Sequence, residues 1–380
     1  GGGEVLGDTV YATAVDGAGN LYVGSLLSAI GPDSVSVAQV AKWDGTTWSP
    51  LGQGLTGQQG VIPRVSALAV SGTYVYAGGA FLMAGGDDIW RLAKWDGSSW
   101  SAVGGMNHFR GNVSTLLAHG DDLYLGGSFN REARLLAKWD GTNLTTVGGG
   151  LNGVPNAMLM MGTKLVVAGE FSMAGDLEVN NIAVWDGASW AALGDGVNGR
   201  ILALAVLGTD LYAGGWFTYA GGKLANYIAR WDGTSWNQVT TRTAVGADGH
   251  VHSLASVRGQ LYASGTFGSA GGVALNAFGR WDGQTWHPVG SGLENVAFTL
   301  LATGGGIYAG GSFTHAGGKE SAYIARLALP GRSSVSHTPD EVVVHFDVGT
   351  GRYDISRAIR LNEWTVLTSR DAGGTGGIEF

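Results

Sequence analysis

The sequence predicts an all-β fold, a seven-bladed β-propeller of four-stranded blades. A Trp-Asp-Gly motif recurs along the chain, its copies stand 44 to 52 residues apart, and short apolar runs bounded by glycine-rich turns surround each copy. A seventh, degenerate copy has Leu327 where the tryptophan should stand. The six complete motifs begin at Trp43, Trp95, Trp139, Trp185, Trp231 and Trp281.

Each repeat unit predicts four strands, as the copy from Ile201 to Val239 illustrates. An apolar inner strand, 201–206, is followed by a turn at 208–210 and a second strand at 211–214. A longer loop leads to a third strand ending at Trp231, and Asp232-Gly233 turns the chain into a fourth strand beginning at Trp236. Asp-Gly between two apolar runs is a strong hairpin signal. The blades are expected to start near residues 10, 65, 113, 157, 201, 251 and 296.

The seventh blade lacks a fourth strand, so ring closure is expected to be incomplete within this chain. The segment Gly1–Gly7 matches the residues that follow strand four in other blades, which suggests that residues upstream of Gly1 supply the missing strand. The alternative is that Glu341–Phe346 fills the gap. The expected domains are a propeller over 1–330, a linker over 331–340 and a short β-rich tail over 341–380.

Composition narrows the function classes. The chain has 68 glycines, 7 prolines and no cysteine, so tight turns abound and disulfides, thiolate metal sites and cysteine nucleophiles are excluded. The net charge of −8 argues against nucleic-acid binding. No apolar run is long enough to span a bilayer, and no signal peptide is visible. No cofactor is predicted.

The recurring residues have structural explanations. Paired tryptophans, such as Trp43 and Trp48, are expected to fill the wedges between neighbouring blades. Glycine pairs, such as Gly78-Gly79, need either room for a close approach or positive φ. A basic residue precedes the tryptophan position in six blades and is expected to pair with acids or aromatic faces of a neighbouring blade. The aspartate of each Trp-Asp-Gly is expected to bond its own turn amides.

The repeat resembles the kelch repeat in its Leu-Tyr-Ala-Gly-Gly strand end at 211–215 and its closing tryptophan. The Gly-Gly-x-Phe-Thr-x-Ala-Gly-Gly loops at 214–222 and 310–318, with the Ile-Ala-Arg-Trp-Asp-Gly strand at 228–233, are similar to repeats of Rax2-type cell-surface proteins and bacterial delta-60 repeat proteins. This resemblance covers about residues 10–329. It implies a propeller, and an extracellular or envelope-associated location.

The tail resembles part of a laminin G-like domain. Val344–Gly351 ends in Asp-x-Gly-x-Gly, and Ile359–Trp364 and Thr368–Arg370 follow it. About forty residues match, which is too few for an independent sandwich core.

No catalytic motif emerges from the sequence. The copper site of galactose-oxidase relatives needs a Tyr–Cys cross-link, and the Asp-Gly-Thr-Thr-Trp48 stretch lacks one residue of a sialidase Asp-box. His250 and His252 share a strand face and could ligate a metal with a third group, but an exposed loop histidine beside a strand histidine is the more ordinary explanation. No calcium loop of recognisable spacing occurs.

Candidate binding residues lie where one blade departs from its siblings in the loops between strands two and three or in the blade connections. Aromatic and arginine side chains on such loops commonly anchor binding surfaces, although ordinary loop variation is the competing explanation for each one. The candidates are Asp87, Trp90, His108, Arg110, Arg131, Arg134, Trp216, Tyr219 and His315. Two sequons, at Asn112 and Asn143, are N-glycosylation candidates in a eukaryotic source.

The leading functional hypothesis is therefore an extracellular, non-catalytic binding or scaffolding module that presents one propeller face to a protein or glycan. One alternative is a subunit of a polymeric extracellular assembly in which another segment or chain closes the ring. The other is a carbohydrate-active lyase or hydrolase, which two carboxylates with a histidine or tyrosine at one mouth of the pore would favour.

Overall fold

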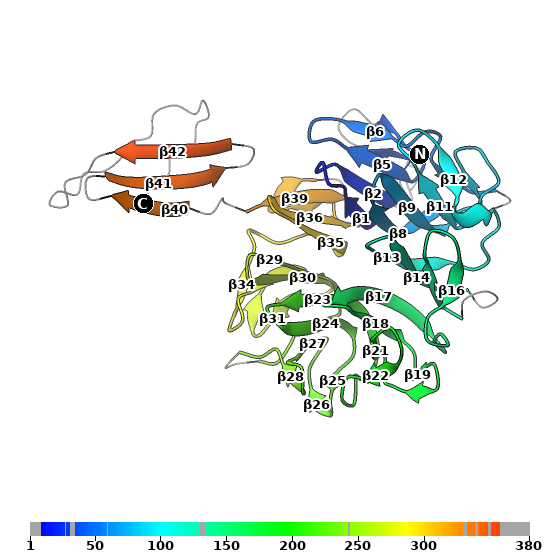
Figure 1. Cartoon of the computed structure of the whole chain (residues 1–380). Coiled ribbons are helices and arrows are strands. Elements are labelled where there is room, and N and C mark those ends of the chain that lie inside the picture. The colour runs from blue at the N-terminus through cyan, green and yellow to red at the C-terminus, as the bar shows by residue number, and fades with distance from the viewer. Residues whose placement is uncertain are drawn as a thin grey trace, which may run out of the picture. The chain divides into compact units, whose positions relative to one another are not determined.

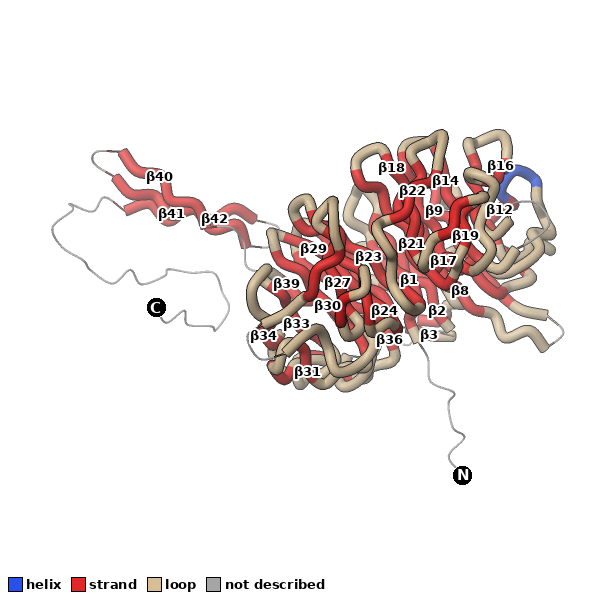
Figure 2. The backbone as a smooth tube through the Cα atoms, turned by 90° about the horizontal axis from the view of Figure 1, so that it is seen from below, coloured by secondary structure: helices blue, strands red, loops and turns tan. Residues whose placement is uncertain are grey.

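A computed structural model describes residues 9–329, except 27, 31–34, 59, 130–133, 242–243 and 322, and the backbone of three later strands, 333–338, 341–348 and 351–357. The chain divides into two compact units, Gly1–Leu327 and Ala328–Phe380. Strands and turns make up almost all of the described chain, which has one 3-10 helix, η1 (Val103–Gly105) (Figure 2). The all-β prediction is confirmed.

Seven blades follow one another around a ring, from blue at β1 to gold at β39 in Figure 1. The inner strands are β1 (Val10–Val15), β8 (Arg64–Ser71), β13 (Val113–His119), β17 (Val154–Met161), β23 (Arg200–Leu207), β29 (Val251–Val257) and β35 (Ala297–Thr303). The second strands are β2 (Leu21–Ser25), β9 (Tyr74–Ala80), β14 (Asp122–Gly127), β18 (Lys164–Glu170), β24 (Asp210–Trp216), β30 (Gln260–Gly265) and β36 (Gly306–Gly311).

The third strands each lead into the Trp-Asp-Gly turn or its degenerate copy. They are β5 (Val40–Trp43), β11 (Leu92–Trp95), β15 (Leu136–Trp139), β21 (Ile182–Trp185), β27 (Ile228–Trp231), β33 (Phe278–Trp281) and β39 (Ile324–Ala328). Six blades have a fourth, outer strand: β6 (Trp48–Pro50), β12 (Trp100–Ala102), β16 (Leu144–Thr146), β22 (Trp190–Ala192), β28 (Trp236–Gln238) and β34 (Trp286–Pro288).

The loops between second and third strands contain short hairpins. Five of them pair within one loop: β3 (Ala29–Ile30) with β4 (Val35–Ser36), β19 (Met173–Ala174) with β20 (Leu177–Glu178), β25 (Tyr219–Ala220) with β26 (Lys223–Leu224), β31 (Ser269–Ala270) with β32 (Val273–Ala274), and β37 (His315–Ala316) with β38 (Lys319–Glu320). In blade two, β10 (Met83–Ala84) pairs instead with β7 (Leu55–Thr56) of the preceding connection.

The glycine pairs provide room for close approach, the first glycine to the next blade and the second to the inner strand of its own blade. A Cβ on Gly78 would lie 2.5 Å from Cγ1 of Val113 in the next blade, and one on Gly79 would lie 2.0 Å from the Arg64 carbonyl oxygen. Neither glycine has positive φ. Of the two explanations that the sequence allows, close approach is therefore the correct one.

The tryptophans fill the wedges between blades, as predicted. Trp231 and Trp236 face each other across the outer hairpin with ring centroids 5.6 Å apart. The buried Trp236 indole donates a 2.7 Å hydrogen bond to the Leu193 carbonyl of the preceding blade. Trp100 bonds the Leu51 carbonyl in the same way. Each such indole therefore joins one blade to the blade before it.

Three of the recurring basic residues find their partners inside their own blade, which corrects the predicted pairing with a neighbour. Lys138 lies 3.0 Å from Asp122, and Arg230 lies 3.1 Å from Asp210. Lys94 sits over the Tyr74 ring at 4.9 Å. The reason is register, because the partner stands on the second strand that pairs directly with the third.

Blade seven contains three paired strands among the described residues, so closure is incomplete in its backbone hydrogen bonding, as expected. Side chains join it to blade one. Val10 packs toward Gly310, where an added Cβ would lie 2.4 Å from its Cγ1, and the Thr13 and Thr299 hydroxyls are 2.8 Å apart. The blade-seven junction thus uses the same glycine–valine contact as the junction at Gly78.

The second unit contains a three-stranded sheet in the order β40 (Ser333–Thr338), β41 (Glu341–Val348), β42 (Gly351–Arg357). Within this unit β41, which contains Glu341–Phe346, pairs with β40 on one side and β42 on the other. β40 falls within the segment that the sequence suggested as a linker.

Candidate binding site at the mouth of the channel

One end of the ring gathers aromatic and basic side chains from five blades. An inner strand begins where the second strand of its blade ends, as the pairing of Arg200 with Trp216 shows. The starts of all inner strands therefore surround one mouth of the central channel. We call the side chains that meet there the channel-mouth cluster: Tyr11, Arg64, Arg200, Trp216, His250, His252 and Phe298.

A continuous series of ring contacts builds this cluster. Trp216 stacks on His250 with centroids 4.6 Å apart and meets the edge of His252 at 6.4 Å. His252 in turn lies 5.5 Å from Phe298. Phe298 stacks on Tyr11 at 5.6 Å, which carries the series from blade five to blade one.

Two guanidinium groups flank the rings. Arg64 lies 5.2 Å from the centroid of Tyr11. Arg200 donates to the side-chain oxygen of Asn156 at 2.8 Å, while its Nε is 4.0 Å from the exposed carboxylate of Glu170. Because the Glu170 carboxylate lies at the distance limit of an ion pair and is exposed to solvent, it compensates the Arg200 charge only weakly.

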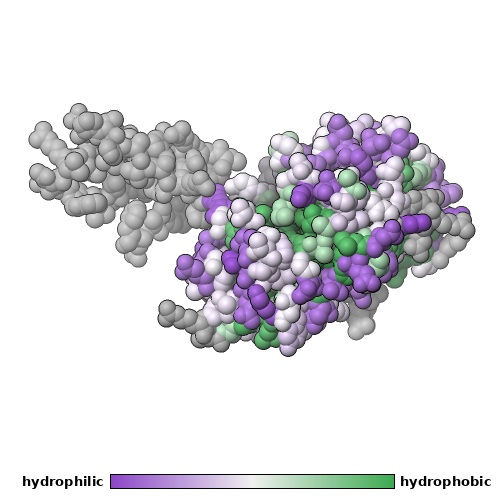
Figure 3. All heavy atoms as spheres, turned by 60° about the horizontal axis from the view of Figure 1, so that its bottom comes forward, coloured by the Kyte–Doolittle hydropathy of each residue, from purple (hydrophilic) through white to green (hydrophobic). Residues whose placement is uncertain are grey.

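His252 is neutral in this environment. Burial lowers its pKa to about 4, and the nearby His250 and Arg200 add to the effect. The cluster therefore offers an aromatic surface with positive charge at its edges. Trp216, at 48% exposure, is its most accessible large hydrophobic side chain. On the face that Figure 3 shows, hydrophobic residues gather in the hollowed middle of the propeller, and hydrophilic residues dominate around it.

A second group forms where blades two and three meet. Trp90 and His108 lie with ring centroids 4.4 Å apart, and both bond the carboxylate of Asp88: the indole at 2.7 Å and His108 Nε2 at 2.9 Å. The structure thus brings the predicted residues Trp90 and His108 together through the carboxylate of Asp88. These hydrogen bonds hold the pKa of Asp88 below its usual range.

His315 belongs to a set of hydrogen bonds, called here the brace, that joins a blade connection to the loop after the second strand of the next blade. In blade five, Asn198 of the connection accepts hydrogen bonds from the Thr218 and Tyr219 amides, and Asp248 does the same for Gly268 and Ser269 in blade six. In blade seven the corresponding residue is Glu294, which bonds His315 at 3.0 Å.

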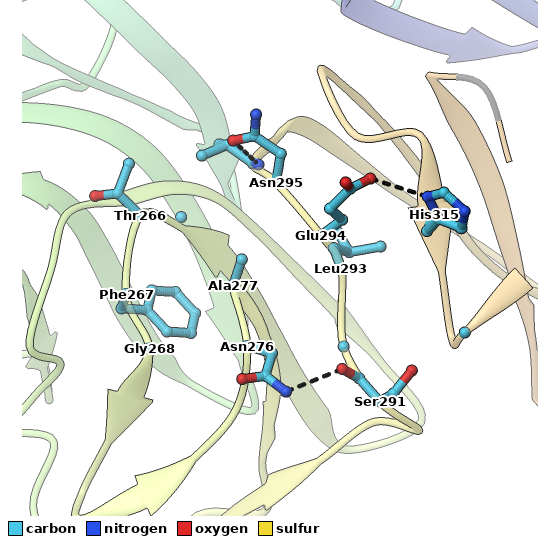
Figure 4. A pocket seen from close by; sticks show the side chains of 14 residues that line it. Thr266, Phe267, Gly268, Asn276, Ala277, Ser291, Leu293, Glu294, Asn295 and His315 are labelled. Atoms are coloured by element: carbon cyan, nitrogen blue, oxygen red, sulfur yellow. Dashed lines mark hydrogen bonds and ion pairs between the residues drawn. The ribbon is translucent and has the colours of Figure 1, made fainter. Parts of the chain in front are cut away.

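A cavity of about 560 Å³ adjoins this pair (Figure 4). In Figure 4, Glu294 and His315 point toward each other from facing segments, and Asn276 donates to the Ser291 carbonyl at 3.1 Å. The brace accounts for His315 without a ligand.

The remaining predicted residues are dispersed. Asp87, Arg110, Arg134 and Tyr219 are exposed, and none of them joins the channel-mouth cluster. Arg131 lies outside the described residues. Asn143 is exposed in the β15–β16 turn, whereas the side chain of Asn112 already accepts a hydrogen bond from Arg91. Among the described residues, no three histidines and carboxylates gather as a metal site.

Sequence reasoning missed Tyr11, Arg64, Arg200 and Phe298. They flank the buried residue that opens each inner strand, such as Val10 or Ile201. Comparing these flanking positions between the repeats would have found them, because the fold constrains only the buried residue.

Comparison with solved structures shows the fold. The extracellular domain of a protein described as a hybrid two-component system of B. thetaiotaomicron matches with a TM-score of 0.53 and 12% identity, over 95% of this chain and 47% of that one. The chain thus spans about half the length of that structure. The WD40 β-propeller domain of Doa1 matches with a TM-score of 0.53 and 12% identity, over 84% of this chain and 92% of that domain.

A catalytically inactive virginiamycin B lyase from Staphylococcus aureus with quinupristin matches with a TM-score of 0.50 and 10% identity, over 86% of this chain and 97% of that one. The fold is a β-propeller. No protein-family model matches the propeller chain, and neither does any curated protein sequence. Within the described residues, the propeller has no apolar helix of the length needed to cross a bilayer.

Proposed function

We propose that this propeller is an extracellular, non-catalytic binding module that holds a glycan or protein partner over the channel-mouth cluster. The observation that carries the proposal is the continuous aromatic surface from Trp216 to Tyr11, flanked by Arg64 and Arg200. Stacking on exposed rings combined with charge-assisted hydrogen bonds from arginine is a common basis of ligand recognition. The extracellular location rests on the resemblance to surface-protein repeats.

The composition of the cluster favours binding over hydrolysis or elimination. General acid–base chemistry on a sugar needs two carboxylates at defined separation or a histidine that titrates near neutral pH. Glu170 is the carboxylate that contacts the cluster among the described residues, and it lies at the edge with an exposed side chain. The lowered pKa of His252 removes it as a proton donor near pH 7 and leaves it only a weak proton acceptor.

Glycan-array retention of the purified chain, with and without a chelator of divalent metals, tests the proposal. For a retained ligand, Trp216→Ala is expected to weaken binding about thirtyfold, as loss of a central aromatic anchor does. Tyr219→Ala is the matched control, because Tyr219 is similarly exposed at 47% but lies outside the cluster, so its loss should leave affinity unchanged.

If the array retains nothing, the glycan version is wrong and a protein partner must be sought by the same pair of variants. Equal effects of Trp216→Ala and Tyr219→Ala would contradict the proposed site altogether.

A further inference from the structure

The cavity between blades six and seven adjoins the channel-mouth cluster. Thr266 lines the cavity and bonds His250 of the cluster twice: its amide donates to the His250 carbonyl at 2.9 Å, and its hydroxyl accepts the His250 amide at 3.1 Å. On the blade-seven side, Asn295 lines the cavity three residues before Phe298, the next ring of the series. The cavity volume of about 560 Å³ is within the range of about 300–1,000 Å³ of small-ligand sites, so it can hold a ligand unit beside the rings.

Asn295 has a side chain where the sister blades have no room for one. The matching residues of blades five and six are glycines. A Cβ added to Gly199 would lie 2.3 Å from the Trp216 carbonyl oxygen, and one added to Gly249 would lie 2.8 Å from that of Thr266. In blade seven the carboxamide oxygen of Asn295 accepts the amide of the following residue at 2.8 Å. Its amide nitrogen has no partner within the described residues, so it is a hydrogen-bond donor available at the cavity (Figure 4).

Glu294 supplies a charged acceptor to the same cavity. One of its carboxylate oxygens, Oε2, accepts hydrogen bonds from the Thr314 hydroxyl and from His315 Nδ1. These bonds hold the pKa of Glu294 below its usual range, so the carboxylate is ionised at neutral pH. The other oxygen, Oε1, takes part in neither bond, and the side chain is 55% exposed. An anionic ligand group is repelled here, whereas a hydroxyl or an amide can donate to Glu294 and accept from Asn295.

The channel-mouth cluster has the opposite charge preference. Arg64 lies over Tyr11 and donates from Nε to the Ser66 hydroxyl at 3.1 Å, and among the described residues it forms no ion pair with a carboxylate. Arg200 has only the weak contact with Glu170. A sugar that carries a carboxylate can therefore stack on the rings and pair with a guanidinium group. The two adjoining sites thus select units of different charge, an acidic unit over the rings and an uncharged unit in the cavity.

We propose that the ligand of the channel mouth is an acidic polysaccharide in which carboxylate-bearing sugars alternate with uncharged ones. The acidic unit lies on the ring cluster and pairs with Arg64 or Arg200. The uncharged unit next to it lies in the cavity, where Asn295 and Glu294 bind its hydroxyl or amide groups. Resting on the proposed function, this ligand class narrows the partner from a glycan or protein to one kind of glycan.

Isothermal titration of the intact chain with four tetrasaccharides tests the ligand class. Hyaluronan and unsulfated chondroitin tetrasaccharides alternate a uronate with an N-acetylhexosamine, tetragalacturonate is acidic at every unit, and cellotetraose is neutral. At least one alternating tetrasaccharide is expected to bind about tenfold more tightly than the other two kinds. Asn295→Gly restores the residue of the sister blades and should weaken this binding about tenfold, because the ligand loses a hydrogen-bond donor. Asn143→Gly, in the exposed β15–β16 turn, is the matched control and should leave it unchanged.

Removal of the cavity charge should produce a gain of binding. Glu294→Gln keeps the length and an acceptor oxygen of the side chain and removes the repulsion, so the affinity for tetragalacturonate should rise about fivefold. Asp248→Asn makes the same charge change at the matching brace position of blade six, outside the cavity lining, and should leave that affinity unchanged. Asparagine is compatible with this position, because Asn198 makes the brace of blade five.

Equal affinity for all four tetrasaccharides, or tightest binding of tetragalacturonate or cellotetraose, overturns the alternating ligand. Unchanged affinity in Asn295→Gly overturns the role of the cavity. In either case, binding that still depends on Trp216 leaves the proposed function standing. The same holds if no tetrasaccharide binds and a protein partner is lost in Trp216→Ala. If no ligand of either class depends on Trp216, the proposed function is wrong as well.

Discussion

Two outer-strand tryptophans, Trp236 and Trp286, differ in the hydrogen bond of the indole nitrogen, which makes them a natural comparison. Trp236 and Trp286 are both buried, yet the Trp236 indole donates to the Leu193 carbonyl and the Trp286 indole nitrogen has no hydrogen-bond partner among the described residues. Trp236→Phe is therefore expected to lower the free energy of unfolding by about 1 kcal/mol more than Trp286→Phe. Urea unfolding of both variants measures the difference, and equal losses would show that the indole bond contributes nothing.

The braced loop is the element that positions Trp216, the most accessible residue of the proposed binding site. Asn198 holds the amides of Thr218 and Tyr219, two and three residues after Trp216. Asn198→Ala should speed hydrogen exchange at both amides and destabilise the fold by about 1 kcal/mol. Asn198→Asp should preserve protection, because Asp248 makes the same bonds at 2.9 and 3.0 Å in blade six. Unchanged exchange in the alanine variant would contradict this role.

At the scale of the whole molecule, acid should destabilise the ring in two steps. His252 has its pKa lowered from 6.5 to about 4, so the unfolded state binds more protons between these values and stability falls as pH drops through them. The turn aspartates, such as Asp232, accept turn amides that hold their pKa below 3.8, so their contribution is lost at lower pH. Thermal unfolding from pH 7 to 2 measures both steps. His252→Gln should remove the first alone; loss of both steps, or of neither, would contradict the assignment.

The fold was predictable because each blade repeats the same physical solution. The Asp-Gly turns, the tryptophan spacing and the glycine pairs recur at matching positions. A strand that is hard to assign in one repeat can therefore be assigned from the other repeats. The ion-pair partners of the recurring basic residues were less predictable. Lys138 meets Asp122 on its own second strand, and only the cross-strand register reveals this pairing.

The channel-mouth cluster was only partly predictable, because it depends on bringing together residues far apart in sequence. Trp216 was predictable because it replaces a small residue of the sister blades. His250 and His252 were predictable as a pair because their spacing places them on one face of a strand. Tyr11 and Phe298 are separated by almost the whole propeller sequence and meet only because the ring brings its first and last blades together. Conversely, His315 looked functional in sequence, and the brace by Glu294 explains it.

The glycine–valine contact also bears on how such a chain can lengthen over evolution. Most repeats carry a glycine that receives a neighbour on one side and an apolar residue that inserts into a neighbour on the other, as Gly78 with Val113 and Gly310 with Val10 show. One gene segment therefore encodes both halves of a joint. Tandem duplication adds a blade that already fits its copies, while the residues flanking the joint, such as Arg64 and Phe298, stay free to diverge toward new ligands.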